Sequence, residues 1–159
     1  MAREAPRTLR SLSATYQQHI DANDYEVIVV DNGSEPPFDL RAVPHLSGNF
    51  RQLRLSPAPA SPARAINAGL AEAGGDVIGV MVDGARLVTP GLLHFARHGA
   101  MLYPRAIVAT LGWYLGFETQ PVAVTSGYTT AREDALLASI DWPSEAHLTA
   151  PCGTPSPLR

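Results

Sequence analysis

Cysteine is nearly absent from this sequence, in which Cys152 is the only one among 159 residues. A single thiol cannot form an internal disulfide, so a secreted disulfide scaffold is excluded. No run of about 18 apolar residues is present, so no transmembrane helix is expected. The N-terminus holds arginine and proline where a secretory signal would be apolar. These absences lead us to expect a cytoplasmic protein.

Several functional signatures are missing as well. No Gly-x-Gly-x-x-Gly follows a predicted strand, and neither a Walker-type Gly-Lys-Ser/Thr loop nor a Gly-x-Ser-x-Gly nucleophile elbow is found. His94 and His98 have the i, i+4 spacing of zinc ligands on a helix, but a third ligand is lacking. The net charge is −3 and the pI is about 5.9, without a basic stripe. We therefore expect no nucleic-acid partner.

What the sequence does contain is a regular alternation of helical and strand patterns. Hydrophobic residues form 45% of the chain, the usual share for a folded domain. Apolar residues spaced three and four apart predict helices at about 6–20, 62–73, 90–103 and 130–140. Apolar or alternating runs predict strands at 25–30, 50–55, 76–82 and 106–111, and a short strand or hairpin within 114–125. This alternation predicts an α/β fold with a mainly parallel sheet.

The predicted organisation is one domain followed by a tail. Residues 1–143 are expected to form the domain, and residues 144–159, rich in proline and threonine, an irregular tail. Ser61 is the expected cap of the second helix, and a capping box from Thr130 to Glu133 is expected to begin the last one. The side chains expected to be buried on the second helix are Ala63, Ile66, Leu70 and Ala73.

Two of the predicted strands end in an aspartate. Asp31 follows the strand at 25–30, and Asp83 follows the strand at 76–82. Because ligands of open parallel sheets bind beyond the carboxyl ends of the strands, both carboxylates should lie on the same rim. There they could accept hydrogen bonds from a nucleobase or a ribose, or bind a divalent cation. Each aspartate could instead cap the turn that follows it, but two on one rim favour a binding site.

Three segments, in this order, resemble a known family. Residues 25–34 (YEVIVVDNGS) are similar to the second strand of family 2 glycosyltransferases and to the Asp-Asp/Asn-Gly-Ser loop in which that strand ends. Residues 62–69 (PARAINAG) are similar to the family's Ala/Arg-Asn-x-Gly helix. Residues 75–86 (GDVIGVMVDGAR) are similar to the strand that carries its Asp-x-Asp motif. The resemblance covers about residues 3–110.

The resemblance implies a fold, an activity and a donor. The fold would be the Rossmann-like GT-A fold of nucleotide-diphospho-sugar transferases, a three-layer α/β/α arrangement with a mainly parallel sheet. The activity would be transfer of a sugar from a nucleoside-diphosphate-sugar donor to an acceptor, by direct displacement with inversion. The sequence does not indicate the sugar, the base or the acceptor.

The resemblance also implies roles for individual residues. Asp31 matches the aspartate that hydrogen-bonds the base of the donor. Asp83 matches the first aspartate of Asp-x-Asp, which contacts the ribose and the metal-diphosphate unit. Asn67 falls at the asparagine of the helix motif, where it could equally tie down the neighbouring loop. The predicted donor-binding residues are Asp31, Asn32, Gly33, Ser34, Arg64, Asn67, Asp83 and Arg86, with Asp83 as the metal ligand.

The sequence departs from the family pattern in its metal motif. Ala85 replaces the last aspartate of Asp-x-Asp. A methyl group cannot bind a metal, so Mg²⁺ or Mn²⁺ would have fewer protein ligands, and Arg86 could partly substitute for the cation. Metal dependence is therefore left open.

Two further departures concern the beginning and the end of the chain. Met1 stands where the family has a turn after its first strand, so we expect that strand to be missing and an anomaly beside Val27–Val30. Either the true start lies upstream, or the place of the missing strand is filled by another segment of this chain or by another chain, as in a homo-oligomer. We also expect most of the acceptor half to be missing, and we assign no catalytic base. The late carboxylates considered for that role are Glu133, Asp134, Asp141 and Glu145.

Three functions remain open from the sequence alone. The first is sugar transfer from a nucleoside-diphosphate sugar. The second is a non-catalytic or truncated nucleotide-binding domain that acts through partner binding. The third is an α/β scaffold whose aspartates are structural.

Overall fold

The computed structural model describes residues 4–58, 60–82, 86–110, 112–116, 118, 120–143 and 152–155. The chain divides into two compact units, Met1–Pro104 and Arg105–Arg159. The division falls after Pro104, whereas the sequence analysis expected one domain to continue to residue 143. The features that resemble a known family lie in the N-terminal unit.

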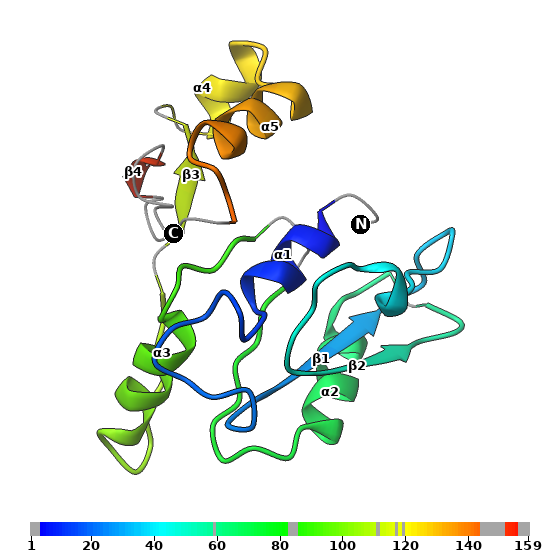
Figure 1. Cartoon of the computed structure of the whole chain (residues 1–159). Coiled ribbons are helices and arrows are strands. Elements are labelled where there is room, and N and C mark those ends of the chain that lie inside the picture. Colours follow the sequence, from blue (N-terminus) through cyan, green and yellow to red (C-terminus); the bar gives the residue numbers. More distant parts are fainter. Residues whose placement is uncertain are drawn as a thin grey trace. The chain divides into compact units, whose positions relative to one another are not determined.

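The N-terminal unit is built around a small parallel sheet (Figure 1). Its elements in chain order are α1 (Ala5–Ser11), β1 (Glu26–Asp31), the 3-10 helix η1 (Leu40–Ala42), β2 (Asn49–Arg54), α2 (Ala63–Glu72) and α3 (Leu92–Met101). β1 and β2 pair in parallel, in a register that sets Glu26 opposite Asn49 and Asp31 opposite Arg54. The predicted strands at 25–30 and 50–55 are confirmed, and their parallel pairing agrees with the mainly parallel sheet that the sequence predicts.

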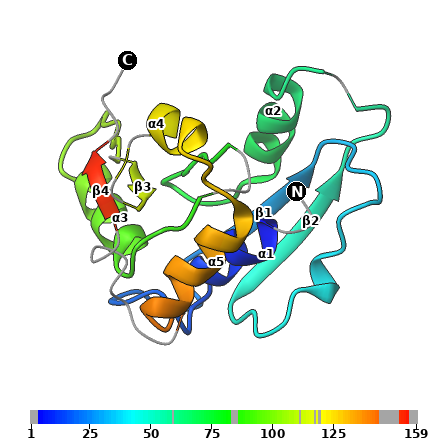
Figure 2. The same cartoon turned by 90° about the horizontal axis from the view of Figure 1, so that it is seen from above.

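The two faces of β1 pack against different helices. Val27 and Val29 pack on a buried cluster that includes Leu9 of α1. Val30 points the other way, because side chains alternate along a strand, and lies against Gly69 of α2. Figures 1 and 2 show α1 and α2 on opposite sides of the sheet. This is the three-layer α/β/α arrangement that the sequence predicts, and it explains why β1 is apolar on both faces.

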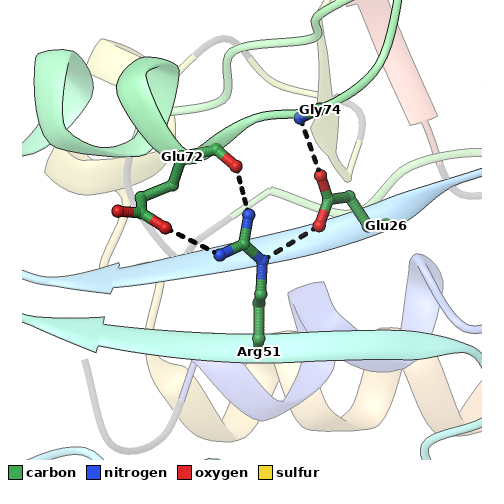
Figure 3. Close-up of polar contacts among 4 residues, drawn as sticks. All are labelled: Glu26, Arg51, Glu72 and Gly74. Carbon is green, nitrogen blue, oxygen red and sulfur yellow. Dashed lines mark hydrogen bonds and ion pairs between the residues drawn. The ribbon is translucent and has the colours of Figure 1, made fainter.

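A charged network fixes the end of α2 to the starts of both strands (Figure 3). Arg51 on β2 donates to Glu26 on β1 at 2.9 Å and to the Glu72 carboxylate at 3.0 Å, and also to the Glu72 carbonyl. Glu26 accepts a further hydrogen bond from the Gly74 amide at 3.1 Å. The bonds from Gly74 and Arg51 lower the pKa of Glu26 in spite of its partial burial. Since α2 ends at the strand starts, it begins at their carboxyl ends.

The first helix is shorter than predicted. α1 ends at Ser11 instead of continuing to residue 20. The Ser11 hydroxyl accepts from the Val88 amide at 3.1 Å, and Ser13 bonds both the amide and the carbonyl of Ser47. Both serines are fully buried. Such side-chain bonds to distant backbone groups compete with helix continuation, and spacing of apolar residues cannot reveal them.

The predicted strand at 76–82 is wrong. The structure assigns no strand there, and β1 has β2 as its one ladder partner among the described residues. The large apolar side chains of this segment are between 40% and 56% exposed. They are Val77, Ile78, Val80, Met81 and Val82. β-propensity is expressed only where a neighbouring strand supplies the ladder, and no described strand does so for residues 76–82. The anomaly expected beside Val27–Val30 stays a prediction.

The two later helices of the N-terminal unit form as predicted, with different details. α2 and α3 lie within the ranges 62–73 and 90–103. Ser61 is not the cap of α2, because the N-cap is Pro62 and no side chain caps it; the Ser61 hydroxyl instead accepts from the Ala63 amide at 3.3 Å. The buried face of α2 is shifted, because Ala65 is buried while Leu70 is 39% exposed.

The C-terminal unit contains β3 (Trp113–Leu115), α4 (Gln120–Thr125), α5 (Thr130–Ser139) and β4 (Cys152–Pro155). β3 and β4 pair antiparallel, so residues 152–155 form a strand inside the predicted irregular tail. No strand is found over 106–110, contrary to prediction. α5 is confirmed, but its cap is Thr129, whose hydroxyl accepts from the Arg132 amide.

None of the helices in the described part of the chain has the length and apolarity needed to cross a membrane.

Candidate functional site

The loops that follow β1 and β2 meet at one rim of the sheet. The two strands are parallel, so their carboxyl ends lie side by side. Gly33, in the loop after β1, has a φ of 79°, and a Cβ on it would collide with the Cβ of Ala58 in the loop after β2. A residue with a side chain would therefore face both strain and collision at this position. The resulting contact joins the two strand-end loops into one surface.

Asp31 holds the first of these loops in shape. Its side chain is fully buried. One carboxylate oxygen accepts from the Ser34 amide at 2.9 Å and the other from the Phe38 amide at 3.3 Å. The predicted hydrogen bond from the nucleobase of the sugar donor to the Asp31 carboxylate does not fit this arrangement, because both carboxylate oxygens accept from the loop's own amides. Asp31 caps the turn, the alternative that its position at a strand end also allowed.

The environment of Asp31 favours its charged form. Burial raises the pKa of the carboxyl group, but the hydrogen bonds from Ser34 and Phe38 and the nearby charge of Arg54 outweigh it. The pKa of Asp31 therefore lies below its ordinary value. A buried anion at the end of β1 is stabilised by the loop that it organises.

Arg54 is a residue of this rim that the sequence analysis missed. It stands opposite Asp31 in the β1–β2 register, and its guanidinium is 3.5 Å from the Ser34 carbonyl. Its side chain is exposed. The signal that could have found it is the pairing of the two strand ends, which requires the register as well as the two strands. The predicted residues Asn32, Gly33 and Ser34 are partly exposed beside it.

The N-terminal turns of α2 present two of the predicted residues. Arg64 and Asn67 are exposed and three positions apart, which sets them on neighbouring positions of one helix face. Because α2 begins at the carboxyl ends of the strands, its N-terminus faces the same end of the sheet as the rim. Helix N-termini carry a partial positive charge and free amide groups that attract anions.

The remaining predicted residues are placed only in part. Asp83 and Ala85 lie outside the described residues, so a shared mouth formed by Asp31 and Asp83 stays a prediction. Arg86 is exposed. The described residues contain no group of three or more His, Cys, Asp or Glu side chains that could hold a metal ion.

The late carboxylates have local roles where the structure describes them. Glu133 lies in the first turn of α5, the position expected of an acidic residue near a helix N-terminus. Asp141 follows α5 with a φ of 49°. Neither observation marks a catalytic base.

These features define an α/β domain in which the loops after two parallel strands meet at one rim. A family model described as "Glycosyl transferase family 2" matches residues 2–83, more than half of the chain. The chain belongs to this family. No curated protein and no solved structure gives a significant match. The matched residues include β1, β2, α2 and both loops of the rim.

Proposed function

We propose that this chain binds the nucleoside-diphosphate-sugar donor of a glycosyltransferase at the rim formed by the loops after β1 and β2. Family membership supports the class of ligand. The observation that carries the location is the contact at Gly33 and Ala58, which joins two loops of the matched region into one surface. The carboxyl edge of a parallel sheet is also where ligands of open α/β folds bind.

The charges at the rim suit a diphosphate. Arg54 and Arg64 are exposed cations, one at the end of β2 and one in the first turn of α2. We expect both to bind diphosphate oxygens, aided by the N-terminus of α2 and by Arg86. Asn32 and Ser34 are expected to contact the base or the ribose, together with the Gly33 backbone. Asn67 would contact the same ligand from α2.

In the proposed reaction, a hydroxyl of the acceptor attacks the anomeric carbon of the sugar. The bond from that carbon to the diphosphate oxygen breaks, and the configuration inverts. The arginines stabilise the charge that develops on the departing diphosphate. The hydroxyl proton must pass to a base, and no residue is assigned to that role.

Mg²⁺ or Mn²⁺ is a separate part of the proposal. Asp83 is the candidate protein ligand, with diphosphate oxygens and water completing the coordination. The described residues supply no metal cluster, so no step of the reaction is derived through the ion. Binding that improves with Mn²⁺ and loses that improvement in Asp83→Asn would support this part.

Thermal shift with UDP, GDP and dTDP tests donor binding. We expect at least one of them to raise Tm, and we expect Arg54→Gln and Arg64→Gln each to reduce that rise, measured from the variant's own Tm without ligand. Arg97→Gln is the matched control, because Arg97 pairs with Asp24 just before the start of β1, at the opposite end of the sheet. The proposal fails if no nucleotide changes Tm, or if the control loses the shift equally.

A non-catalytic nucleotide-binding domain that acts through a partner is the second candidate. It is favoured by the exposed apolar run at 77–82, because contiguous apolar surface marks interaction sites. Hydrolysis or transfer of the sugar from a bound donor would exclude it. It would be supported if the chain binds the donor but neither hydrolyses it nor transfers its sugar, even at high protein concentration.

A further inference from the structure

Three histidines from distant parts of the N-terminal unit gather beside α3. His94 and His98 lie one turn apart on the helix, and His19 belongs to the segment between α1 and β1. The ring centroids of His94 and His98 are 4.1 Å apart at an interplanar angle of 40°. The ring centroid of His19 is 5.6 Å from that of His94. The helical spacing is visible in the sequence, but the approach of His19 is not.

The backbone determines which nitrogen of two rings carries the proton. Nδ1 of His94 is 2.7 Å from the His19 carbonyl oxygen, and Nδ1 of His98 is 2.8 Å from the His94 carbonyl oxygen. A carbonyl oxygen can only accept, so each Nδ1 donates its hydrogen. Each neutral ring therefore keeps its lone pair on Nε2. Metal-binding histidines are oriented by this same hydrogen bond from the opposite ring nitrogen.

The backbone at His19 supports this orientation. His19 has a φ of 62°, an uncommon conformation for a residue other than glycine. In this conformation its carbonyl accepts the hydrogen bond from the His94 ring. His19 thus connects the segment before β1 to α3 through its backbone.

The surroundings allow a cation to enter. The His98 side chain is exposed and His94 is partly exposed. His98 lies in the last turn of α3, where the partial negative charge of a helix C-terminus favours cations. Arg97 adds a positive charge on the same helix, but it is paired with Asp24 at 3.5 Å.

We propose that His94 and His98 bind a divalent transition-metal ion of the Zn²⁺ class through their Nε2 atoms. Imidazole is a preferred ligand of such ions. No third His, Cys, Asp or Glu completes a cluster among the described residues, so water fills the remaining positions. His19 is a positioning residue that acts through its carbonyl. Neither His94 nor His98 is among the residues proposed to bind the donor, so the two proposals can fail separately.

Isothermal titration with ZnCl₂ at neutral pH tests the proposal. We expect the wild-type chain to bind Zn²⁺, and His94→Gln and His98→Gln each to weaken binding by about tenfold or more, since loss of an outer partner alone costs roughly 10–100-fold. His45→Gln is the control, because His45 is exposed in the same unit and should leave the affinity unchanged. Circular dichroism establishes that each variant folds. The proposal is overturned if wild type binds no Zn²⁺ or if both variants bind as wild type does.

A second variant tests the role given to His19. His19→Gly keeps the carbonyl and tolerates the positive φ, so we expect its Zn²⁺ affinity to stay within about threefold of wild type. Nitrogen chemical shifts of the His94 and His98 rings should still report metal on Nε2. A loss of affinity as large as in His94→Gln would overturn the assignment of His19 as a positioning residue.

Discussion

At the scale of single residues, the buried carboxylate of Asp31 shapes the loop that follows β1. Its oxygens accept from the Ser34 and Phe38 amides at 2.9 and 3.3 Å. Hydrogen bonds to charged groups contribute about 1.5–3 kcal/mol each. An amide side chain in its place would keep one acceptor but turn a donor toward the second backbone amide.

Asp31→Asn should therefore remove an acid-dependent part of the stability. The pKa of Asp31 is lowered by folding, so its charge stabilises the protein above the ordinary aspartate pKa of about 3.9, and the stabilisation is lost as pH falls through the lower, folded value. We expect the free energy of unfolding of wild type to exceed that of D31N by about 1–3 kcal/mol near neutral pH, and this difference to shrink below about pH 4. Urea denaturation at several pH values measures it. A difference that stays constant in acid would contradict this account.

The position of Asp31 is predictable from the sequence, but its partners are not. The β-branched run before it predicts a strand end, and hence a place on the rim. The amides of Ser34 and Phe38 reach its carboxylate only because the loop folds back. Arg54 was missed for a similar reason, since its position opposite Asp31 depends on strand register.

At the scale of elements, the rim depends on close approach of the loops after β1 and β2. Gly33→Ala should destabilise the protein by roughly 1–3 kcal/mol, because alanine is strained at a φ of 79° and its Cβ would collide with Ala58. Urea denaturation of G33A measures the loss. Gly79→Ala is the matched control, because nothing lies within 4 Å of a Cβ at Gly79.

The double variant G33A/A58G separates the two causes of this loss. Removing the Ala58 side chain relieves the collision but leaves the backbone strain, so we expect only part of the stability to return. If G33A loses as little stability as G79A, the two loops do not approach each other closely in solution.

The sequence predicted those elements that local pattern decides. The spacing of apolar residues is that of a strand in β1 and β2 and that of a helix in α2 and α3, and turn residues follow each element. The segment at 76–82 carries an equally clear strand pattern, but a strand also needs a neighbour to complete its hydrogen bonds. The end of α1 was mispredicted because Ser11 and Ser13 bond to residues far along the chain.

At the scale of the whole molecule, the exposed run at 77–82 predicts self-association. Residues 77–82 include no charged side chain, and their backbone pairs with no strand that the structure describes. An exposed apolar segment of this kind can pair with the same segment of another copy. Val80→Lys should shift the chain toward monomer, since a charge interrupts such pairing. Analytical ultracentrifugation over a range of concentrations measures this.

Val122→Lys is the control for this prediction. Val122 is 48% exposed in α4 of the C-terminal unit, outside the apolar run. Equal effects of V80K and V122K, or a wild-type chain that stays monomeric at high concentration, would contradict a specific role for 77–82. The homo-oligomer expected from the sequence stays a prediction until then.

The most direct measurement of donor binding is a nuclear magnetic resonance titration of the chain with the nucleoside diphosphate that gives the largest thermal shift. The account predicts that the backbone amide signals of Gly33, Ser34 and Arg64 move together with one dissociation constant, while that of Gly79 stays in place. Signals that do not move at saturating nucleotide, or that move only in the C-terminal unit, would contradict it.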